Sequence, residues 1–214
     1  MKAQSQKRQR RSNEAGFSLI ELVMIATLMG IMTAITVPQL AGQRRLVRAA
    51  AVSRDMMTQL RYARQMAMSE RTAYTFQYNN TTKKIIVIDN NATGATVLND
   101  ANYPNNTGST IVATTDLTGS GLDSTEINYG VPTGLPTSAL SDGVSMTALT
   151  SGKINITFQP DGTVVDATGT PVDRALYVYN TKVPKETAAA ISIMGAAGRI
   201  KLWRYYSVTN TYVE

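Results

Sequence analysis

Two groups of residues carry side chains able to do chemistry, and the first is a single carboxylate, Glu21. It is the fifth residue of an otherwise apolar stretch of 21 residues, Phe17 to Val37. That is about the length of a membrane-spanning helix. A carboxylate at membrane depth costs about 2.5–3.5 kcal/mol on insertion scales. We therefore interpret Glu21 as a functional group and not as an incidental polar residue in an ordinary anchor.

The second group lies near the end of the chain, on a predicted strand. Period-two alternation places one set of side chains on a common face, namely Arg199, Lys201, Trp203 and Tyr205. On an exposed face these residues would suit nucleic acid, with Arg204 as a further contact, because cations meet phosphates while rings stack on bases. The alternative, which we favour, is a sheet strand whose charges discourage edge association.

Composition excludes several classes of chemistry. The chain has no cysteine and no histidine, which rules out disulfides, Cys/His zinc sites, Ser-His-Asp triads and histidine bases. No acidic stretch matches an ordered calcium loop, so Asn99-Asp100 and Asp116 are interpreted as turn residues. No spacing of acids indicates a glycosidase-like carboxylate pair. We therefore expect no enzyme, no cofactor and no metal site.

The element that precedes Glu21 is a basic leader. Residues 1–16 hold five bases and one acid, and the positive-inside rule keeps such a flank cytoplasmic. A secretory signal peptide also begins this way, but here the apolar run is too long and no convincing small-x-small site follows it. The net charge is +6, but residues 17–214 hold only 16 bases against 14 acids. The overall charge therefore says little about a nucleic-acid partner.

Residues 39–71 are predicted to continue the helix beyond the apolar span as an amphipathic segment. One face carries small and apolar residues at alternating steps of three and four, namely Leu46, Ala49, Ser53, Met56, Leu60, Ala63 and Ala67. Arginines occupy the other faces. We interpret them as solvated or subunit-facing, in preference to a site for anionic lipid or nucleic acid. Glu70 and Arg71 end the pattern.

Residues 72–214 are predicted to form a β-rich head. Residues 73–78 and 84–88 predict a hairpin packed on the helix, whereas 89–151 are polar and irregular. Further on, a two-hairpin antiparallel sheet is predicted from the segments 154–158, 163–165, 174–179, 189–194 and 199–206. The expected fold class is α+β, with a long N-terminal helix, membrane-spanning in its first half, packed against an antiparallel β-sheet head.

The start of the chain resembles the processing site of a type IV prepilin or pseudopilin. The resemblance rests on Gly16-Phe17 followed by Ser18-Leu19-Ile20-Glu21 at the head of the apolar run, and on Pro38 in the long helix. It implies cleavage after Gly16 by a membrane-embedded prepilin peptidase and N-methylation of Phe17. It also implies that Glu21 helps the subunit to enter a helical filament.

The head is similar to the H-type pseudopilins of type II secretion and their minor-pilin relatives. The motifs are Leu60 to Ala67 on the helix, the Phe-Gln-Pro-Asp-Gly turn at 158–162, the Ala-Ile-Ser-Ile strand and the terminal Gly-Arg strand. Some minor pilins of this kind capture DNA through a Gly-Arg-x-Arg type tail. Here Gly198-Arg199-Ile200-Lys201 matches that tail only in part.

These expectations divide the chain into a leader (1–16), a transmembrane or filament-core helix (17–38), an amphipathic continuation (39–71) and the head (72–214). The favoured function is a minor pilin or pseudopilin of the bacterial inner membrane, with a periplasmic head. It would assemble near a filament tip, with other subunits, the peptidase and the membrane as partners. A DNA-capturing minor pilin is the alternative, and an anchored enzyme is the weakest hypothesis. The sequence does not separate a pilus from a secretion pseudopilus.

Overall fold

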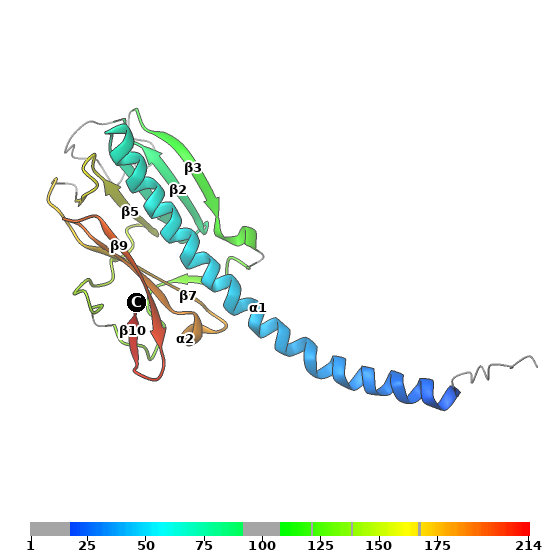
Figure 1. The fold of residues 1–214 in the computed structure, drawn as a ribbon. Helices are drawn as coiled ribbons and strands as arrows, with labels where there is room; N and C mark the ends of the chain where they lie inside the picture. The colour runs from blue at the N-terminus through cyan, green and yellow to red at the C-terminus, as the bar shows by residue number, and fades with distance from the viewer. Residues whose placement is uncertain (1–17, 92–107, 121, 138, 167) are drawn as a thin grey trace, which may run out of the picture. The chain divides into compact units, whose positions relative to one another are not determined.

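The computed structural model describes residues 18–91, 108–120, 122–137, 139–166 and 168–214. The chain divides into two compact units, Met1–Gly42 and Gln43–Glu214. Helix α1 (Leu19–Glu70) contributes residues to both. The second unit is the head, and it contains the sheets (Figure 1).

The part of α1 in the first unit is apolar and exposed. The window Leu19–Thr36 has a mean hydropathy of 2.0 and none of it is buried. Length and composition would allow this segment, alone among the described helices, to cross a membrane. A core helix of a soluble protein can be equally long and apolar, but it is buried, which this segment is not. A signal sequence near an N-terminus can have the same length and composition.

The part of α1 in the head packs through the predicted face. Ala49, Ser53, Met56, Leu60, Ala63 and Ala67 are all buried, whereas Leu46, the first residue of the stripe, is exposed. Alanine, methionine, leucine and arginine favour helix throughout this stretch. The predicted end at Glu70 is confirmed, and Arg71 follows with a left-handed φ of 57°.

The first sheet has the order β3-β2-β1-β5-β6. Its strands are β1 (Tyr74–Asn79), β2 (Lys84–Asp89), β3 (Thr110–Asp116), β5 (Lys153–Phe158) and β6 (Val164–Val165). The predicted hairpin β1–β2 is confirmed. Strand β3 contains the short apolar run Ile111-Val112, whose side chains are exposed, and the 3₁₀ helix η2 (Leu117–Ser120) follows it.

The second sheet has the order β10-β9-β8-β7-β4. Its strands are β4 (Ile127–Tyr129), β7 (Arg174–Asn180), β8 (Ala189–Met194), β9 (Arg199–Tyr206) and β10 (Thr211–Val213), with the short helix α2 (Pro184–Thr187) between β7 and β8. All the strand pairs described in both sheets are antiparallel. The α+β class is therefore confirmed.

The prediction of one two-hairpin sheet after Lys153 is wrong. The β5–β6 hairpin pairs with β1 in the first sheet, whereas β7, β8 and β9 belong to the second. The register of β5 on β1 puts matching polar side chains opposite each other. Thr75 lies 2.8 Å from Thr157, and Gln77 donates to Asn155 at 2.9 Å. Such cross-strand pairs stabilise one register.

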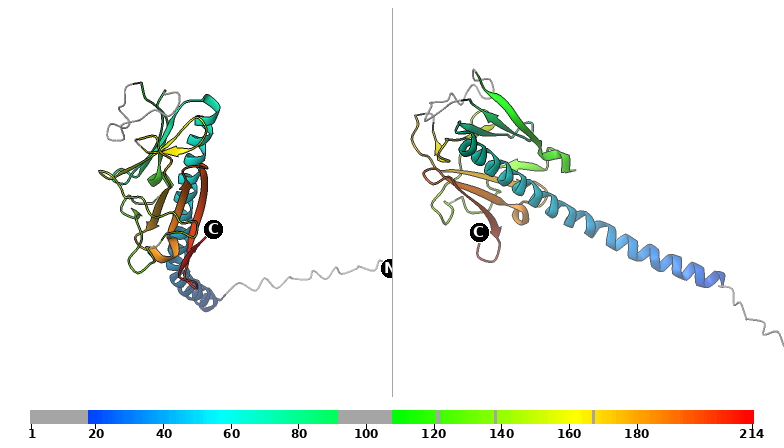
Figure 2. Two further views of the ribbon diagram at one scale, coloured as in Figure 1. Left: turned by 90° about the vertical axis from the view of Figure 1, so that its left-hand side faces the viewer. Right: turned by 45° about the horizontal axis from the view of Figure 1, so that its top comes forward.

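The head contains two apolar cores. In the larger one, α1 packs against both sheets (Figures 1 and 2). Met56 and Leu60 of α1 belong to one buried apolar cluster with Phe76 and Ile156 of the first sheet and Ile191 of the second. The smaller core lies on the other face of the second sheet. There the segment 131–144 supplies Leu135, Leu140 and Val144, which pack with strand residues such as Tyr177, Trp203 and Tyr212. The second sheet is therefore covered on both faces.

Candidate functional site

The apolar segment of α1 satisfies its own hydroxyl groups. Thr27, Thr33 and Thr36 each donate to the carbonyl four residues earlier, at 3.0, 2.7 and 2.8 Å. A hydroxyl bonded in this way needs no partner outside the helix, which matters where water is absent.

Glu21 differs from these threonines. It lies in the first turn of α1, is exposed, and has no hydrogen bond or ion pair within the described residues. The helix N-terminus favours a carboxylate there, because unpaired N–H groups carry partial positive charge. Gly16 and Phe17, the predicted cleavage and methylation residues, lie outside the described residues.

The C-terminal strand does not present the exposed face on which the nucleic-acid alternative depends. Alternation along β9 is as predicted, but Trp203 is 5% exposed and belongs to the smaller core. The nucleic-acid alternative assumed an exposed indole, but the Trp203 ring instead packs in the smaller core with Leu135, Leu140 and Val144. Lys201 forms an ion pair with Glu214 and lies 5.0 Å from the centre of the Trp203 ring. Arg199 and Arg204 are exposed.

A buried chain of hydrogen bonds fixes Trp203. Its indole Nε1 donates to Ser192 Oγ at 2.8 Å, and that hydroxyl donates to Asp142 Oδ2 at 2.5 Å. The other oxygen of Asp142 accepts from the Val144 backbone N–H at 3.2 Å. The side-chain polar atoms of Trp203, Ser192 and Asp142 therefore all have partners. The segment around Asp142 is held on the sheet by both apolar packing and hydrogen bonds.

Three motifs that are far apart in the sequence meet at one junction of the head. Arg64 of α1 donates through Nε to the Gly162 carbonyl and through Nη2 to the Ala197 carbonyl, both at 3.3 Å. Gly162 lies in the β5–β6 turn and Ala197 in the β8–β9 turn. A Cβ on Gly198 would lie 1.9 Å from the Gly162 oxygen. The junction therefore joins the helix and one turn from each sheet.

The sequence contained all three motifs but gave no signal that they touch. Their contact depends on the path of β5 into the first sheet, which was predicted wrongly. Glycine at positions 162 and 198 is explained by positive φ angles of 82° and 59° together with the close backbone approach.

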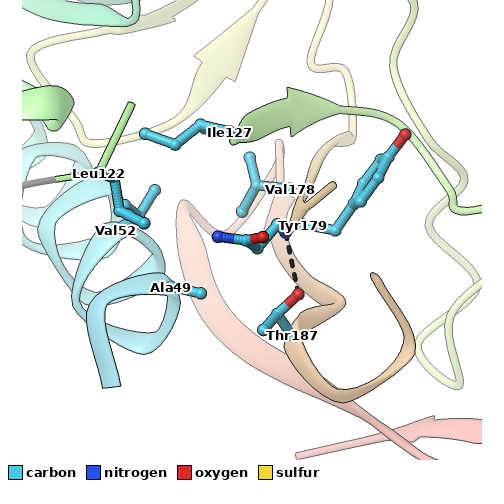
Figure 3. Close-up of a pocket in the computed structure, with 8 residues that line it drawn as sticks. Ala49, Val52, Leu122, Ile127, Val178, Tyr179 and Thr187 are labelled. Carbon is cyan, nitrogen blue, oxygen red and sulfur yellow. Dashed lines mark hydrogen bonds between the residues drawn. The ribbon is translucent and has the colours of Figure 1, made fainter. Parts of the chain in front are cut away.

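A small hollow lies between α1 and the second sheet. Ala49 and Val52 of α1 face Ile127 and Val178 across it (Figure 3). Its volume is about 10 Å³, which is room for a single water molecule. Asn180 lines it and has a buried amide nitrogen without a partner. The remaining lining is largely apolar, so the hollow is a small packing gap beside one unsatisfied amide.

Acidic side chains of the described head serve local structure. Within the described residues no cluster of three acidic side chains could hold a metal ion. Asp116 is a turn residue as predicted, since its Oδ1 accepts from the N–H and hydroxyl of Thr118 at 2.9 and 2.6 Å. These bonds lower the pKa of the carboxyl group. Asn99-Asp100 lies outside the described residues.

The architecture is that of an α+β protein with an exposed apolar N-terminal helix segment and an antiparallel head. No protein-family model and no characterised protein sequence matches the chain. Solved structures similar to it include two crystal forms of the type IV minor pilin FimU of Pseudomonas aeruginosa. Both are 18% identical and cover 72% of this chain; they match over 86% and 90% of their own length, with TM-scores of 0.43 and 0.42.

The minor pseudopilin EpsH of the Type 2 Secretion System of Vibrio cholerae is also similar. It is 11% identical, and the match covers 72% of this chain and 95% of that one, with a TM-score of 0.42. At these identities the likeness concerns the fold.

Proposed function

We propose that the chain is a minor pilin or pseudopilin, a structural subunit of a type IV pilus or a type II secretion pseudopilus. The observation that carries the proposal is the lone carboxylate of the exposed apolar helix. The hydroxyls of Thr27, Thr33 and Thr36 are satisfied inside the helix, whereas Glu21 has no partner within the described residues. We infer that this carboxylate gains its partner from another chain, because an unpaired charge in apolar surroundings is costly.

The sequence motif supplies the chemistry of that partner. Cleavage between Gly16 and Phe17 would leave a positively charged amine on Phe17, which is N-methylated in the proteins that this motif resembles. We infer that the amine of one subunit pairs with Glu21 of its neighbour. In hydrocarbon, a paired carboxylate is far less costly than an unpaired one. The exposed apolar face of the helix would then pack against other subunits in the filament after leaving the inner membrane.

The test of assembly is Glu21→Ala in the full chain. We expect membrane insertion to be unchanged or improved, because a charge is removed. Incorporation into filaments should fall about tenfold or more, the effect of losing about 1.4 kcal/mol of pairing. The measurement is the ratio of filament-bound to membrane-bound chain, with intact mass spectrometry to read whether the chain begins at Phe17.

The matched control is Glu186→Ala, which removes an exposed carboxylate from α2 of the head. It should leave the ratio unchanged. Normal incorporation of Glu21→Ala would show that the carboxylate is dispensable. A membrane-derived chain that begins at any residue other than Phe17 would contradict the proposed processing.

DNA capture finds no support in the geometry of β9. The one tryptophan is buried and Lys201 is paired, so two of the expected contacts are unavailable without rearrangement. The proposal is therefore limited to the structural subunit.

A further inference from the structure

Strand β9 runs along α1 in the opposite direction, so it ends near the point where α1 enters the head. Its first residue follows the junction described above. At its other end, the Tyr205 N–H donates to the Ala188 carbonyl at 3.0 Å, directly after α2, and α2 lines the small hollow together with Ala49 of α1. The β9–β10 turn (207–210), α2 and the first turns of α1 after Gln43 therefore lie at one end of the head, which we call the anchor end (Figure 1).

Exposed apolar side chains gather at the anchor end. Val208 in the β9–β10 turn is 79% exposed, and Tyr206 on β9 is 52% exposed. Val213 on β10 is also exposed, and alternation places it with Tyr206 on the face of the hairpin that is turned away from the smaller core. On α1, Leu46 and Val47 are exposed as well. In other parts of the described head, the exposed large apolar residues are Met68, Ile111, Val112 and Met146. Apolar exposure of this kind marks a contact with a protein or a membrane.

The charges of the anchor end are mainly positive. Its exposed cations are Arg44, Lys182, Lys185 and Arg204, and its exposed acids are Asp123 and Glu186. Arg45 and Glu126 form an ion pair with each other. Arg204 lies on the same face of the hairpin as Tyr206 and Val213. Tyrosine, aliphatic side chains and cations together are typical of surfaces that contact the membrane–water interface.

The length of the chain keeps a bilayer within reach of this surface. The apolar window ends at Thr36 and the head begins at Gln43. Seven residue steps, from 36 to 43, span at most about 25 Å even when they are fully extended. With the apolar segment inserted, the anchor end therefore stays close to the headgroup layer, for any conformation of the residues between them.

We propose that the anchor end of the head docks on the surface of the bilayer that holds its own α1, at anionic phospholipid headgroups. Tyr206, Val208 and Val213 enter the headgroup layer, and Arg204 meets the lipid phosphates. This inference rests on the proposed function only in taking the apolar segment as membrane-inserted. A second copy of the chain is the competing occupant. Lipid is favoured because a short tether gives the bilayer a far higher effective concentration than a diffusing partner has.

The experiment is fluorescence quenching by lipid, on the full chain reconstituted in vesicles. The chain has no cysteine, so one introduced cysteine carries a bimane label alone. Val208→Cys puts the label in the β9–β10 turn. The matched control, Ala196→Cys, puts it in the exposed turn before β9, at the other end of that strand. The vesicles contain phosphatidylethanolamine and phosphatidylglycerol with a trace of a lipid that carries a nitroxide on its headgroup, and phosphatidylcholine vesicles are the neutral comparison.

A second pair of variants, made with Val208→Cys, tests the charge. Arg204→Gln should lower the ratio of docked to undocked heads about fivefold, the effect of one basic residue near an anionic surface. Arg199→Gln is its control, because Arg199 is an exposed arginine at the start of the same strand, and it should leave the ratio unchanged. Thermal unfolding shows whether each variant is folded. If Arg204→Gln does not fold, the comparison of the two lipid compositions decides with Arg204 in place.

We expect stronger quenching of the label at Val208→Cys than at Ala196→Cys, and a smaller difference in phosphatidylcholine. Equal quenching of the two labels overturns the inference, and so does quenching that is unchanged in phosphatidylcholine or by Arg204→Gln. Bimane emission that shifts to shorter wavelength only at a high ratio of protein to lipid, without lipid quenching, assigns the surface to a second copy and overturns it too. A chain that does not float with the vesicles contradicts the membrane anchor itself. Filament incorporation is a separate measurement, so a failure of the docking leaves the proposed subunit role standing.

Discussion

The two parts of α1 place their apolar side chains in opposite surroundings. Leu28 in the first unit is 57% exposed, whereas Leu60 in the head is fully buried against both sheets. The head segment is stabilised by contacts within the chain, as most helices are. In the first segment, the backbone and hydroxyl groups are hydrogen-bonded within the helix. Its apolar side chains, however, pack against nothing in the described part of their unit. In the function proposed above, lipid or other subunits would supply their surroundings.

The largest expected effect comes from comparing these two leucines directly. Leu60→Ala should lower the free energy of unfolding of the head by about 2–5 kcal/mol, because it leaves a cavity in a packed core. Leu28→Ala should change it by about 0.5 kcal/mol or less. Denaturant unfolding of the full chain in detergent measures both. Equal effects would mean that the two parts of α1 share one stabilising environment.

The next comparison uses two glycines. Gly198→Ala puts a Cβ against the Gly162 carbonyl at a positive φ, so the junction must open, at a cost of about 2–4 kcal/mol. At Gly30 a Cβ meets nothing within 4 Å, and alanine favours helix by about 1 kcal/mol. Because Gly30 lies in the first unit and not in the head, Gly30→Ala should leave the unfolding of the head unchanged. A stable Gly198→Ala head would contradict the close contact of the two turns.

The smallest effect depends on pH and compares two threonines. Asp161 has a lowered pKa in the folded head through Thr163, so its contribution is present above the unfolded pKa and is lost as the pH falls. Thr163→Val should cost about 0.5 kcal/mol or less at pH 7, given the exposure of the carboxylate, and less near pH 3. Thr33→Val removes a bond with no titrating partner and should show no such dependence in unfolding titrations at the two pH values. If Thr163→Val lowered stability equally at both pH values, the hydrogen bond between Thr163 and the ionised Asp161 would not contribute to the stability of the head.

Local patterns predicted the local elements well. The end of α1 at Glu70, the buried face from Ala49 to Ala67 and the hairpin β1–β2 follow from periodicity within short windows. Strands β3 and β4 lie in the segment 89–151, which was predicted to be irregular, so that prediction is wrong there. Strand β10 was not predicted either, because three residues after the turn at Asn210 carry too little pattern. The partner of β5 was predicted wrongly, since strand pairing over such a distance along the chain leaves no local signal.

The candidate sites also divide into features that local sequence predicts and features that depend on distant segments. Glu21 was evident from one charge in an apolar run, and the structure adds that the threonines around it are satisfied. The burial of Trp203 could not be predicted, because the apolar residues that cover it, Val131, Leu135, Leu140 and Val144, are irregularly spaced among prolines, glycines and serines.

The hydrogen-bonded Trp203 gives the head a natural optical reporter. It is the only tryptophan in the chain, and its indole is enclosed by the smaller core and bonded through Ser192 to Asp142. Its fluorescence therefore arises from one environment and would shift to longer wavelength when water reaches the ring. Detachment of the segment 131–144 and unfolding of the second sheet could be followed by this emission, without any label.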